Sequence, residues 1–332
     1  MEKKMKNIAV ILPGELPVPN TYGGAIETIV QLTIDENEIY KKFNISIFSF
    51  YEKKAKEIAN KYKYSNFIWI KKYFWYSPLY FFLKALRKIG FHNVDRLDGY
   101  ILRSKLKNHK FDKVIVYGNP TQLIALSKII PTNKLVFYAH ANLFNKCNHV
   151  SLNTGKKAYL YLMVSNYTSK HIQKYAKFDN DKCKVIRNPI DFESFNKYSN
   201  IKRPIELVKK YDLNDDELIF LFVGRIVPEK GIKHLLEALL DFPKNVKYKL
   251  FIVGSFGSSF GKKETHDKFR KEIFNLIEKI KDNIVFTGFI SNKELPSYHA
   301  LSDIVFMPSI YSEPAGMVAI EALASGRPVI TT

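Results

Sequence analysis

The most constraining feature of this sequence is a regular alternation of short apolar runs with longer stretches of helical periodicity. Runs that are apolar throughout and rich in β-branched residues are typical of strands buried on both faces of a parallel sheet. The first series of runs is 8–12, 45–50, 114–117, 135–139, 161–164 and 183–186, and the second is 218–223, 249–253, 283–286, 304–307 and 328–331. Helical patterns in the second series cover 232–240, 268–280, 294–301 and 317–324. We therefore predict an α/β protein with two doubly wound parallel sheets.

The length of the chain also favours two domains. At 332 residues the chain exceeds the size at which a single hydrophobic core stops growing, about 250–300 residues. The segment Asn188-Pro-Ile-Asp191 is a proline turn, and polar, aperiodic sequence follows it as far as Lys210. We predict an N-terminal domain over residues 1–190 and a C-terminal domain over residues 191–332.

The charge balance is strongly basic and restricts the partners. Lysine and arginine number 52 against 32 aspartates and glutamates, which gives a net charge of +20. Such a charge attracts nucleic acid, phospholipid or phosphorylated small molecules. No nucleic-acid-binding module is recognisable, so a nucleic acid is not expected as a partner.

Several features indicate the cytoplasm. Cys147 and Cys183 are the only cysteines, too few for a disulfide scaffold. The first apolar run is too short for a signal-peptide core, and no uncharged run reaches the roughly 18 residues of a spanning helix. We expect a cytoplasmic protein whose membrane contact is peripheral, on the inner face of the plasma membrane.

One segment, Phe67 to His92, differs from the rest of the chain. It holds ten aromatic residues with lysines and arginines around them, and it contains no acid. Aromatic side chains favour a membrane interface and cations attract lipid phosphates, so an element lying on an anionic membrane surface is one interpretation. A buried helix pair with basic ends is the other, and the sequence leaves both open.

The strongest motif runs from Tyr311 to Pro328, after one strand and into a helix. Glu313 falls in the loop and Glu321 about one turn inside the helix. Ionised carboxylates accept strong hydrogen bonds, so Glu313 suits sugar hydroxyls and Glu321 both ribose hydroxyls. The backbone amides of Gly316, Met317 and Val318 would form an anion site at the helix N-terminus. For two glutamates alone, an acidic helix start and a solvated side chain would be the better explanation.

A second motif is Gly224-Arg225 to Lys230-Gly231, which also follows a strand and precedes a helix. Such loops present their charges at the carboxyl ends of a parallel sheet, where α/β proteins bind ligands. Arg225 and Lys230 therefore suit two phosphates, and they would stabilise the charge that develops on a leaving diphosphate. Two surface cations are the alternative in so basic a chain.

Three weaker signals complete the candidate site. Gly23 and Gly24 follow the first strand and would let the backbone approach a phosphate or an acceptor. Gly254 opens a Ser/Gly-rich loop that extends to Gly261, which would line the donor site or form a surface loop. His140 ends a strand and is placed to touch the donor sugar, although a lone histidine is often structural.

No metal site is expected. Asp179-Asn180-Asp181 has the letters of a metal-binding Asp-x-Asp, but it lies in a polar turn before its strand. No histidine and cysteine cluster offers another site. The phosphates would then be balanced by Arg225, Lys230 and helix dipoles, without a metal or other cofactor.

Together these motifs resemble family 4 of the retaining GT-B glycosyltransferases, over nearly the whole chain. The matching segments are Tyr22-Gly23-Gly24, Val164-Ser165, Val185 to Asp191, Gly224 to Gly231, Gly288-Phe289-Ile290 and Glu313 to Pro328. The resemblance implies a GT-B fold, with two Rossmann-like domains facing a cleft. The first would recognise the acceptor and the second the nucleotide sugar.

The resemblance also implies a role for each matching residue. Arg225 and Lys230 would clamp the diphosphate, and Glu321 would bind the ribose. The expected catalytic residues are Arg225, Lys230, Glu313 and His140. The expected donor-binding residues are Glu321, Gly23, Gly24, Gly316, Met317, Val318, Gly254 and Ile290, the last by its backbone at the base.

Three departures from the family pattern bear on the pocket and on activity. Ala315 stands where many relatives carry a bulky aromatic residue, and Pro189 where many carry glycine. Relatives continue beyond the position of Thr332, so we expect the C-terminal part to be truncated and turnover to be weakened.

The expected activity is metal-independent transfer of a hexose or N-acetylhexosamine, with retention. The donor would be a UDP-sugar, with GDP-mannose as the alternative, and the acceptor a lipid-linked or cell-envelope glycan. Other functions left open are a non-catalytic sugar-nucleotide-binding scaffold, a GT-B epimerase and a GT-B phosphorylase. A nucleic-acid-binding protein ranks below all of these.

Overall fold

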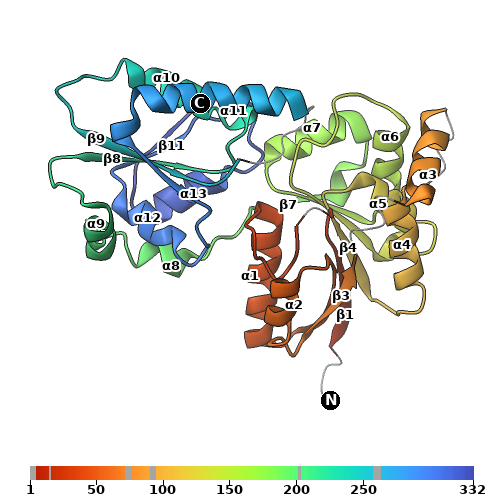
Figure 1. The fold of residues 1–332 in the computed structure, drawn as a ribbon. Helices are drawn as coiled ribbons and strands as arrows, with labels where there is room; N and C mark the ends of the chain where they lie inside the picture. The colour runs from red at the N-terminus through yellow and green to blue at the C-terminus, as the bar shows by residue number, and fades with distance from the viewer. Residues whose placement is uncertain (1–4, 15, 72–76, 90–94, 201–202, 257–262) are drawn as a thin grey trace. The chain divides into compact units, whose positions relative to one another are not determined.

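The computed structural model describes residues 5–14, 16–71, 77–89, 95–200, 203–256 and 263–332. The chain forms two compact units, Met1–Pro189 and Ile190–Thr332, divided one residue from the expected boundary. Each unit contains one parallel sheet covered by helices (Figure 1). The predicted α/β class, with two Rossmann-like doubly wound domains, is confirmed.

The N-terminal unit is built on a seven-stranded sheet in the order β3-β2-β1-β4-β5-β6-β7, and its neighbouring strands are parallel. Its strands are β1 (Lys6–Ile11), β2 (Phe43–Phe50), β3 (Ser65–Ile70), β4 (Lys113–Tyr117), β5 (Leu135–Ala139), β6 (Leu160–Met163) and β7 (Cys183–Val185). The strand order reverses between β1 and β4. The carboxyl ends of these two strands are therefore a topological switch point, where open α/β sheets bind ligands.

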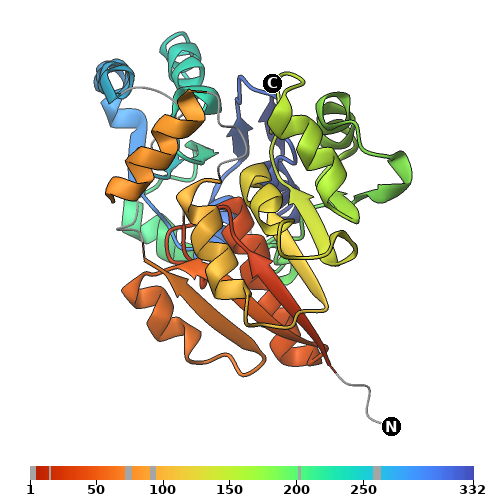
Figure 2. The ribbon, with the colours of Figure 1, turned by 90° about the vertical axis from the view of Figure 1, so that its right-hand side faces the viewer.

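Helices cover both faces of this sheet. They are α1 (Ala25–Tyr40), α2 (Lys53–Ala59), α3 (Pro78–Lys88), α4 (Leu97–Leu106), α5 (Pro120–Leu126), α6 (His149–Lys157) and α7 (Asn166–Ala176). Figure 1 shows α1 and α2 on one side of the sheet and α4, α5 and α6 on the other. Figure 2 faces this unit and shows α4 and α5 in front of the sheet. Every residue of β5 is buried, as the continuous apolar run predicts for a strand covered on both faces.

Strand β3 corrects the prediction for the segment Phe67 to His92. Both interpretations of the segment, an interfacial amphipathic element and a buried helix pair, include Phe67 to Ile70, whereas these residues pair with β2 as a parallel edge strand. Residues 72–76 and 90–92 of the segment lie outside the described residues. The remaining part is helix α3, which exposes several large apolar side chains and therefore does not form a buried helix pair.

The C-terminal unit has a five-stranded parallel sheet in the order β10-β9-β8-β11-β12. Its strands are β8 (Leu218–Val223), β9 (Tyr248–Val253), β10 (Ile284–Gly288), β11 (Ile304–Met307) and β12 (Val329–Thr331). Its helices are α8 (Phe192–Asn196), α9 (Ile205–Tyr211), α10 (Ile232–Leu240), α11 (Lys263–Lys279), α12 (Leu295–Leu301) and α13 (Met317–Ala324).

Two apolar clusters hold this second sheet between its helix layers. Strand β8 supplies both, because successive side chains point to opposite faces. Phe220 and Phe222 pack with residues of α10 and α11, on the upper side of the sheet in Figure 1. Ile219 and Leu221 pack with residues of α8, α12 and α13 on the other side. The sheet is thereby fixed from both faces, and the loops at its carboxyl edge rest on a rigid support.

Candidate functional site

Loops that follow three adjacent strands of the C-terminal unit are joined by backbone hydrogen bonds. The Gly224 amide donates to the Val253 carbonyl at 2.9 Å, and the Gly254 amide donates to the Gly288 carbonyl at 2.8 Å. At Gly254, a Cβ would lie 1.9 Å from the Gly224 carbonyl oxygen. Glycine at 254 therefore allows the loops after β8 and β9 to meet backbone against backbone. The rest of the predicted glycine-rich loop, Gly257 to Gly261, lies outside the described residues.

Gly231 connects the loop after β8 to the loop after β11. Its φ of 68° is left-handed, and a Cβ there would lie 1.6 Å from the Pro308 carbonyl oxygen. The Ile310 amide donates to the Glu229 carbonyl at 3.1 Å beside it. These contacts explain on physical grounds why a glycine follows Lys230.

We expect Gly231→Ala to lower the free energy of unfolding by about 2 kcal/mol more than Gly288→Ala does, because the new methyl group overlaps the Pro308 carbonyl. Gly288 is the matched control, since its φ is 71° but a Cβ there meets nothing within 4 Å. Urea unfolding of both variants separates the steric cost from the cost of the left-handed backbone. If both variants lost the same free energy of unfolding, the contact between residue 231 and the Pro308 carbonyl would contribute nothing to stability.

The close contact between these loops brings Lys230 and Glu313 together, 83 residues apart in sequence. The Lys230 ammonium forms an ion pair with Glu313 Oε1, and both side chains are largely buried. Ser309 donates to the same carboxylate at 2.8 Å, and the Tyr311 hydroxyl donates to Glu313 Oε2 at 2.8 Å. The Lys230 ammonium also lies over the Tyr311 ring, 5.2 Å from its centroid. The cluster holds one cation and one carboxylate in a defined geometry at the edge of the sheet.

Tyr311 and Arg225 complete the cluster. Burial and the Glu313 carboxylate raise the pKa of the Tyr311 hydroxyl, whereas the Arg225 charge acts in the opposite direction. Arg225 is therefore close enough to act on this cluster, and it is exposed to solvent. We note that sequence reasoning missed Tyr311 and Ser309. Their polar side chains between a strand and a helix were a signal, but their shared carboxylate was not visible.

Helix α13 begins beside this cluster, four residues after Glu313. Gly316 caps it with a φ of 56° and provides no side-chain acceptor for the first amides. The amides of Met317 and Val318 are at the helix N-terminus, where backbone donors and the helix dipole favour an anion. The predicted anion site is thus part of the same carboxyl edge as Lys230.

Glu321 lies on α13 and faces a buried histidine of α12. Its Oε2 is 3.7 Å from His299 Nε2, and the Glu321 side chain is only 13% exposed. Burial raises the pKa of Glu321 to about 7 and lowers the pKa of His299 to about 3. Neither ring nitrogen of His299 has a hydrogen-bond partner among the described residues. A carboxylate that burial makes costly to ionise is a marker of a functional site. Sequence reasoning missed His299, because a histidine on an amphipathic helix has no distinct pattern.

Ile290 lies two residues beyond β10. Its side chain packs against the apolar cluster that also contains Val305 and Ala322. This packing holds the segment from Gly288 to Ile290 at the carboxyl edge of the sheet, next to the loop after β9.

The remaining predicted residues belong to the N-terminal unit. Gly23 and Gly24 have φ values of 78° and 103°, and Gly24 is the N-cap of α1. The Gly23 amide donates to Asn20 Oδ1 at 2.8 Å. Because side chains rarely tolerate the φ of Gly24, this turn also requires glycine.

His140 follows β5 and packs on two tyrosines. Its ring is stacked on Tyr117 at 5.4 Å and lies 4.2 Å from the Tyr138 ring, centroid to centroid. Burial lowers the pKa of His140 to about 4, so the ring is neutral at neutral pH. Both of its nitrogens are buried, and neither has a hydrogen-bond partner in the described parts of the chain. Buried polar atoms usually have partners, so a bound ligand is a reasonable source of one.

No three His, Cys, Asp or Glu side chains among the described residues gather as metal ligands. None of the described helices combines the length and the apolarity needed to cross a membrane. Metal independence stays a prediction.

Comparison with known proteins agrees with this geometry. The family model of group 1 glycosyl transferases matches residues 205–332, which hold the loops after β8 to β11 and helix α13. Residues 205–332 are a group 1 glycosyl transferase domain. The narrower assignment to family 4 stays a prediction.

Relatives extend the likeness of this glycosyl transferase domain to the whole chain. An uncharacterized glycosyltransferase of Methanocaldococcus jannaschii is 33% identical over 46% of this chain and 36% of its own length. Spore coat protein SA of Bacillus subtilis is 26% identical over 98% of this chain and 80% of its own. HepE of Anabaena, solved with UDP and glucose, matches with a TM-score of 0.69 at 19% identity, over 98% of this chain and 80% of HepE. Together with the two sheets, this shows the GT-B fold. The chain spans about a third of the length of the first of these relatives.

Proposed function

We propose that this protein transfers a sugar from a nucleoside diphosphate donor to a glycan acceptor, with retention of the anomeric configuration and without a metal ion. The observation that carries the proposal is the Lys230–Glu313 pair, held by Ser309 and Tyr311 beside the N-terminus of α13. Lys230, Glu313 and the first amides of α13 lie at one edge of a sheet, and their chemistry suits phosphate and sugar hydroxyls, which supports the proposal.

The proposed chemistry requires electrostatic stabilisation more than a protein nucleophile. As the bond from the anomeric carbon to the diphosphate breaks, negative charge grows on the leaving phosphate. Arg225, Lys230 and the Met317 amide stabilise that charge more in the transition state than in the ground state. The acceptor hydroxyl forms the new bond on the same face of the sugar, and its proton passes to a phosphate oxygen. Glu313 orients the donor sugar.

Glu321 and His140 have complementary proposed roles. Glu321 accepts hydrogen bonds from the two ribose hydroxyls, which stabilise the ionised carboxylate that burial disfavours. His140 is neutral and offers one ring donor and one ring acceptor to a sugar hydroxyl. Both roles use groups whose burial is costly in the absence of a ligand.

For the donor we propose a UDP-linked hexose or N-acetylhexosamine. Solved structures of HepE, whose fold this chain shares, contain UDP and UDP-glucose, which supports a uridine nucleotide here. For the acceptor we propose a lipid-linked or cell-envelope glycan, because a surface rich in aromatic and basic groups suits a substrate held at a membrane. Such an enzyme would work as a peripheral protein at the cytoplasmic membrane surface.

A thermal-shift screen of UDP-glucose, UDP-N-acetylglucosamine and GDP-mannose tests the donor. We expect a UDP-sugar to raise the melting temperature, because a ligand that binds only the native state stabilises it by RT ln(1 + [L]/Kd). Glu321→Ala should reduce the shift, whereas Glu278→Ala should leave it unchanged, since the Glu278 side chain is 72% exposed on α11.

The outcomes of that screen separate the alternatives. Binding of a UDP-sugar with no hydrolysis or transfer would favour a non-catalytic scaffold. Isomerised donor would indicate an epimerase, and a requirement for inorganic phosphate would indicate a phosphorylase. No shift with any nucleotide sugar would contradict the proposed function.

A further inference from the structure

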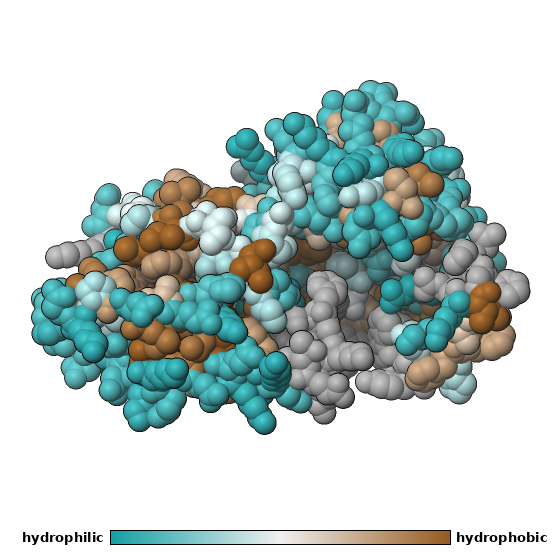
Figure 3. Space-filling view, turned by 90° about the horizontal axis from the view of Figure 1, so that it is seen from above, coloured by the Kyte–Doolittle hydropathy of each residue, from teal (hydrophilic) through white to brown (hydrophobic). Residues whose placement is uncertain are grey.

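Helix α3 carries large apolar side chains on its outer surface. Leu79, Phe81 and Phe82 are 51%, 56% and 60% exposed, and Ile89 directly after the helix is 71% exposed. Leu83 points inward and is buried among residues of the first sheet and α4. In Figure 3, brown and tan atoms lie at the right-hand edge of the view, where Figure 1 places α3. Leaving this many apolar groups in water on one short helix indicates an interaction surface.

The charge of the helix limits what this surface can bind. Lys84 and Lys88 are exposed, and no acidic residue occurs between Lys63 and Val94. The whole chain carries a net charge of +20. An apolar helix surface that also carries exposed lysines matches an anionic lipid bilayer, which offers acyl chains beneath a layer of phosphates.

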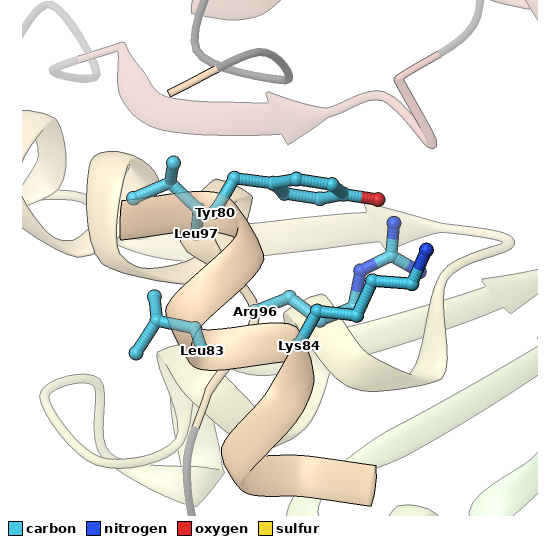
Figure 4. A pocket seen from close by; sticks show the side chains of 5 residues that line it. All are labelled: Tyr80, Leu83, Lys84, Arg96 and Leu97. Carbon is cyan, nitrogen blue, oxygen red and sulfur yellow. The ribbon is translucent and has the colours of Figure 1, made fainter. Parts of the chain in front are cut away.

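A pocket of about 190 Å³ opens between α3 and α4, lined by Tyr80, Leu83, Lys84, Arg96 and Leu97. Figure 4 shows the cationic ends of Lys84 and Arg96 side by side at one end of it, with the Tyr80 hydroxyl pointing the same way. Leu83 and Leu97 lie away from these polar groups.

The contacts of these side chains fit a phosphate site. The Lys84 ammonium is 5.9 Å from the Tyr80 ring centroid, and Arg96 Nε is 3.5 Å from Asp98 Oδ1. Because the Arg96 side chain remains 35% exposed, its guanidinium can meet an incoming anion while it holds Asp98. Two cations and a hydroxyl at one end of a pocket supply the donors that a phosphodiester requires.

We infer that α3 and this pocket form a binding site for an anionic phospholipid at a membrane surface. The headgroup phosphate lies between Lys84 and Arg96, with the Tyr80 hydroxyl as a further donor. Phe81, Phe82 and Ile89 enter the boundary between headgroups and acyl chains. The inference deepens the proposed function, because it names the surface on which a lipid-linked acceptor would be met.

Sedimentation with lipid vesicles tests the inference. We expect the protein to bind vesicles of phosphatidylglycerol and phosphatidylcholine, and not vesicles of phosphatidylcholine alone. Lys84→Ala with Arg96→Ala should weaken binding about tenfold or more, since each cation near an anionic surface contributes substantially. The control is Lys53→Ala with Lys54→Ala, which removes the same charge from two exposed positions of α2, on the other side of the sheet.

A second pair of variants tests the contribution of the apolar side chains to vesicle binding. Phe81→Ser with Ile89→Ser should weaken vesicle binding about tenfold or more, because the buried apolar area is lost. Phe192→Ser with Ile205→Ser should leave it unchanged, although these side chains are equally exposed at 56% and 70% in the C-terminal unit. If the control variants lost as much vesicle binding, the inference would be overturned. Binding would then be due to the net charge of the protein or to nonspecific hydrophobic adsorption.

Donor binding distinguishes this inference from the proposed function. The variants at Lys84 and Arg96 and at Phe81 and Ile89 should keep the thermal shift with UDP-sugar, since these residues are not part of the donor cluster. Loss of vesicle binding with donor binding intact supports the lipid site. Donor binding with no vesicle affinity in the unmodified protein would overturn the lipid site alone. Vesicle binding with no donor binding would contradict only the proposed function.

Discussion

Replacing Lys230 with methionine is expected to lower the turnover number of sugar transfer about 100- to 1,000-fold, the usual effect of removing one preorganised charge from a developing anion. Methionine keeps an unbranched apolar chain against the Tyr311 ring, so the change removes chiefly the charge. Donor affinity should fall by less than about tenfold, because the interaction is strongest in the transition state. Steady-state kinetics with a UDP-sugar, together with calorimetric donor binding, measure the two effects separately.

The control for this variant is Lys233→Met, in the first turn of α10. Lys233 pairs with Glu272 of α11 at 3.0 Å and is outside the cluster, so its loss should leave turnover unchanged. If Lys230→Met weakened binding and turnover equally, Lys230 would serve only to hold Glu313. That result would contradict its assignment to the leaving phosphate.

Replacing Glu321 with glutamine is expected to stabilise the protein at alkaline pH while it weakens donor binding. Burial raises the pKa of Glu321 from 4.5 to about 7. Below pH 4.5 the carboxyl is protonated in both the folded and the unfolded chain, so its titration does not change the free energy of unfolding. Between about pH 4.5 and 7 the unfolded chain releases the proton first, which lowers the free energy of unfolding. Above pH 7 the buried carboxylate lowers the free energy of unfolding by about 3 kcal/mol, at about 1.36 kcal/mol per pKa unit.

The two buried histidines have the opposite effect on the pH dependence of stability, because burial lowers their pKa values. Burial lowers the pKa of His299 to about 3 and that of His140 to about 4, so their contributions are lost as pH falls below about 6.5. For this reason the measurement is the difference between the variant and the unmodified protein. In urea unfolding, Glu321→Gln should match the unmodified protein near pH 4.5 and exceed it by about 3 kcal/mol at pH 8. An equal effect of Glu278→Gln, or no gain at pH 8, would contradict this account.

Donor affinity should change in the other direction. Ribose hydroxyls donate to the ionised carboxylate, so UDP binding by the unmodified protein should weaken as pH falls below about 7. The glutamine variant should bind UDP more weakly at pH 8 and lose this pH dependence. A variant that is more stable yet binds less well is the pattern expected of a site residue that carries a stability cost.

Much of the second sheet could be predicted from the sequence. The expected ranges 218–223, 304–307, 232–240 and 317–324 match β8, β11, α10 and α13 residue for residue. Those elements have clear apolar patterns and are bounded by glycine, proline or polar residues, so the local sequence and the tertiary structure agree. Strand β3 was missed, because its apolar residues run on into an aromatic and basic segment and no turn signal marks its end.

The sequence by itself determined the two parallel sheets, the glycine-bounded loops at their carboxyl ends and the residue types that suit a phosphorylated sugar. Those properties are local, since periodicity and turn chemistry act within a few residues. Only the tertiary structure decided that Lys230 pairs with Glu313, that Glu321 faces His299, and that Lys84 meets Arg96 at one end of a pocket. Each of these depends on segments that are distant in sequence or on which face of a helix is buried. Strand order and packing fix those relations, and they convert plausible residue types into groups with defined partners and shifted pKa values.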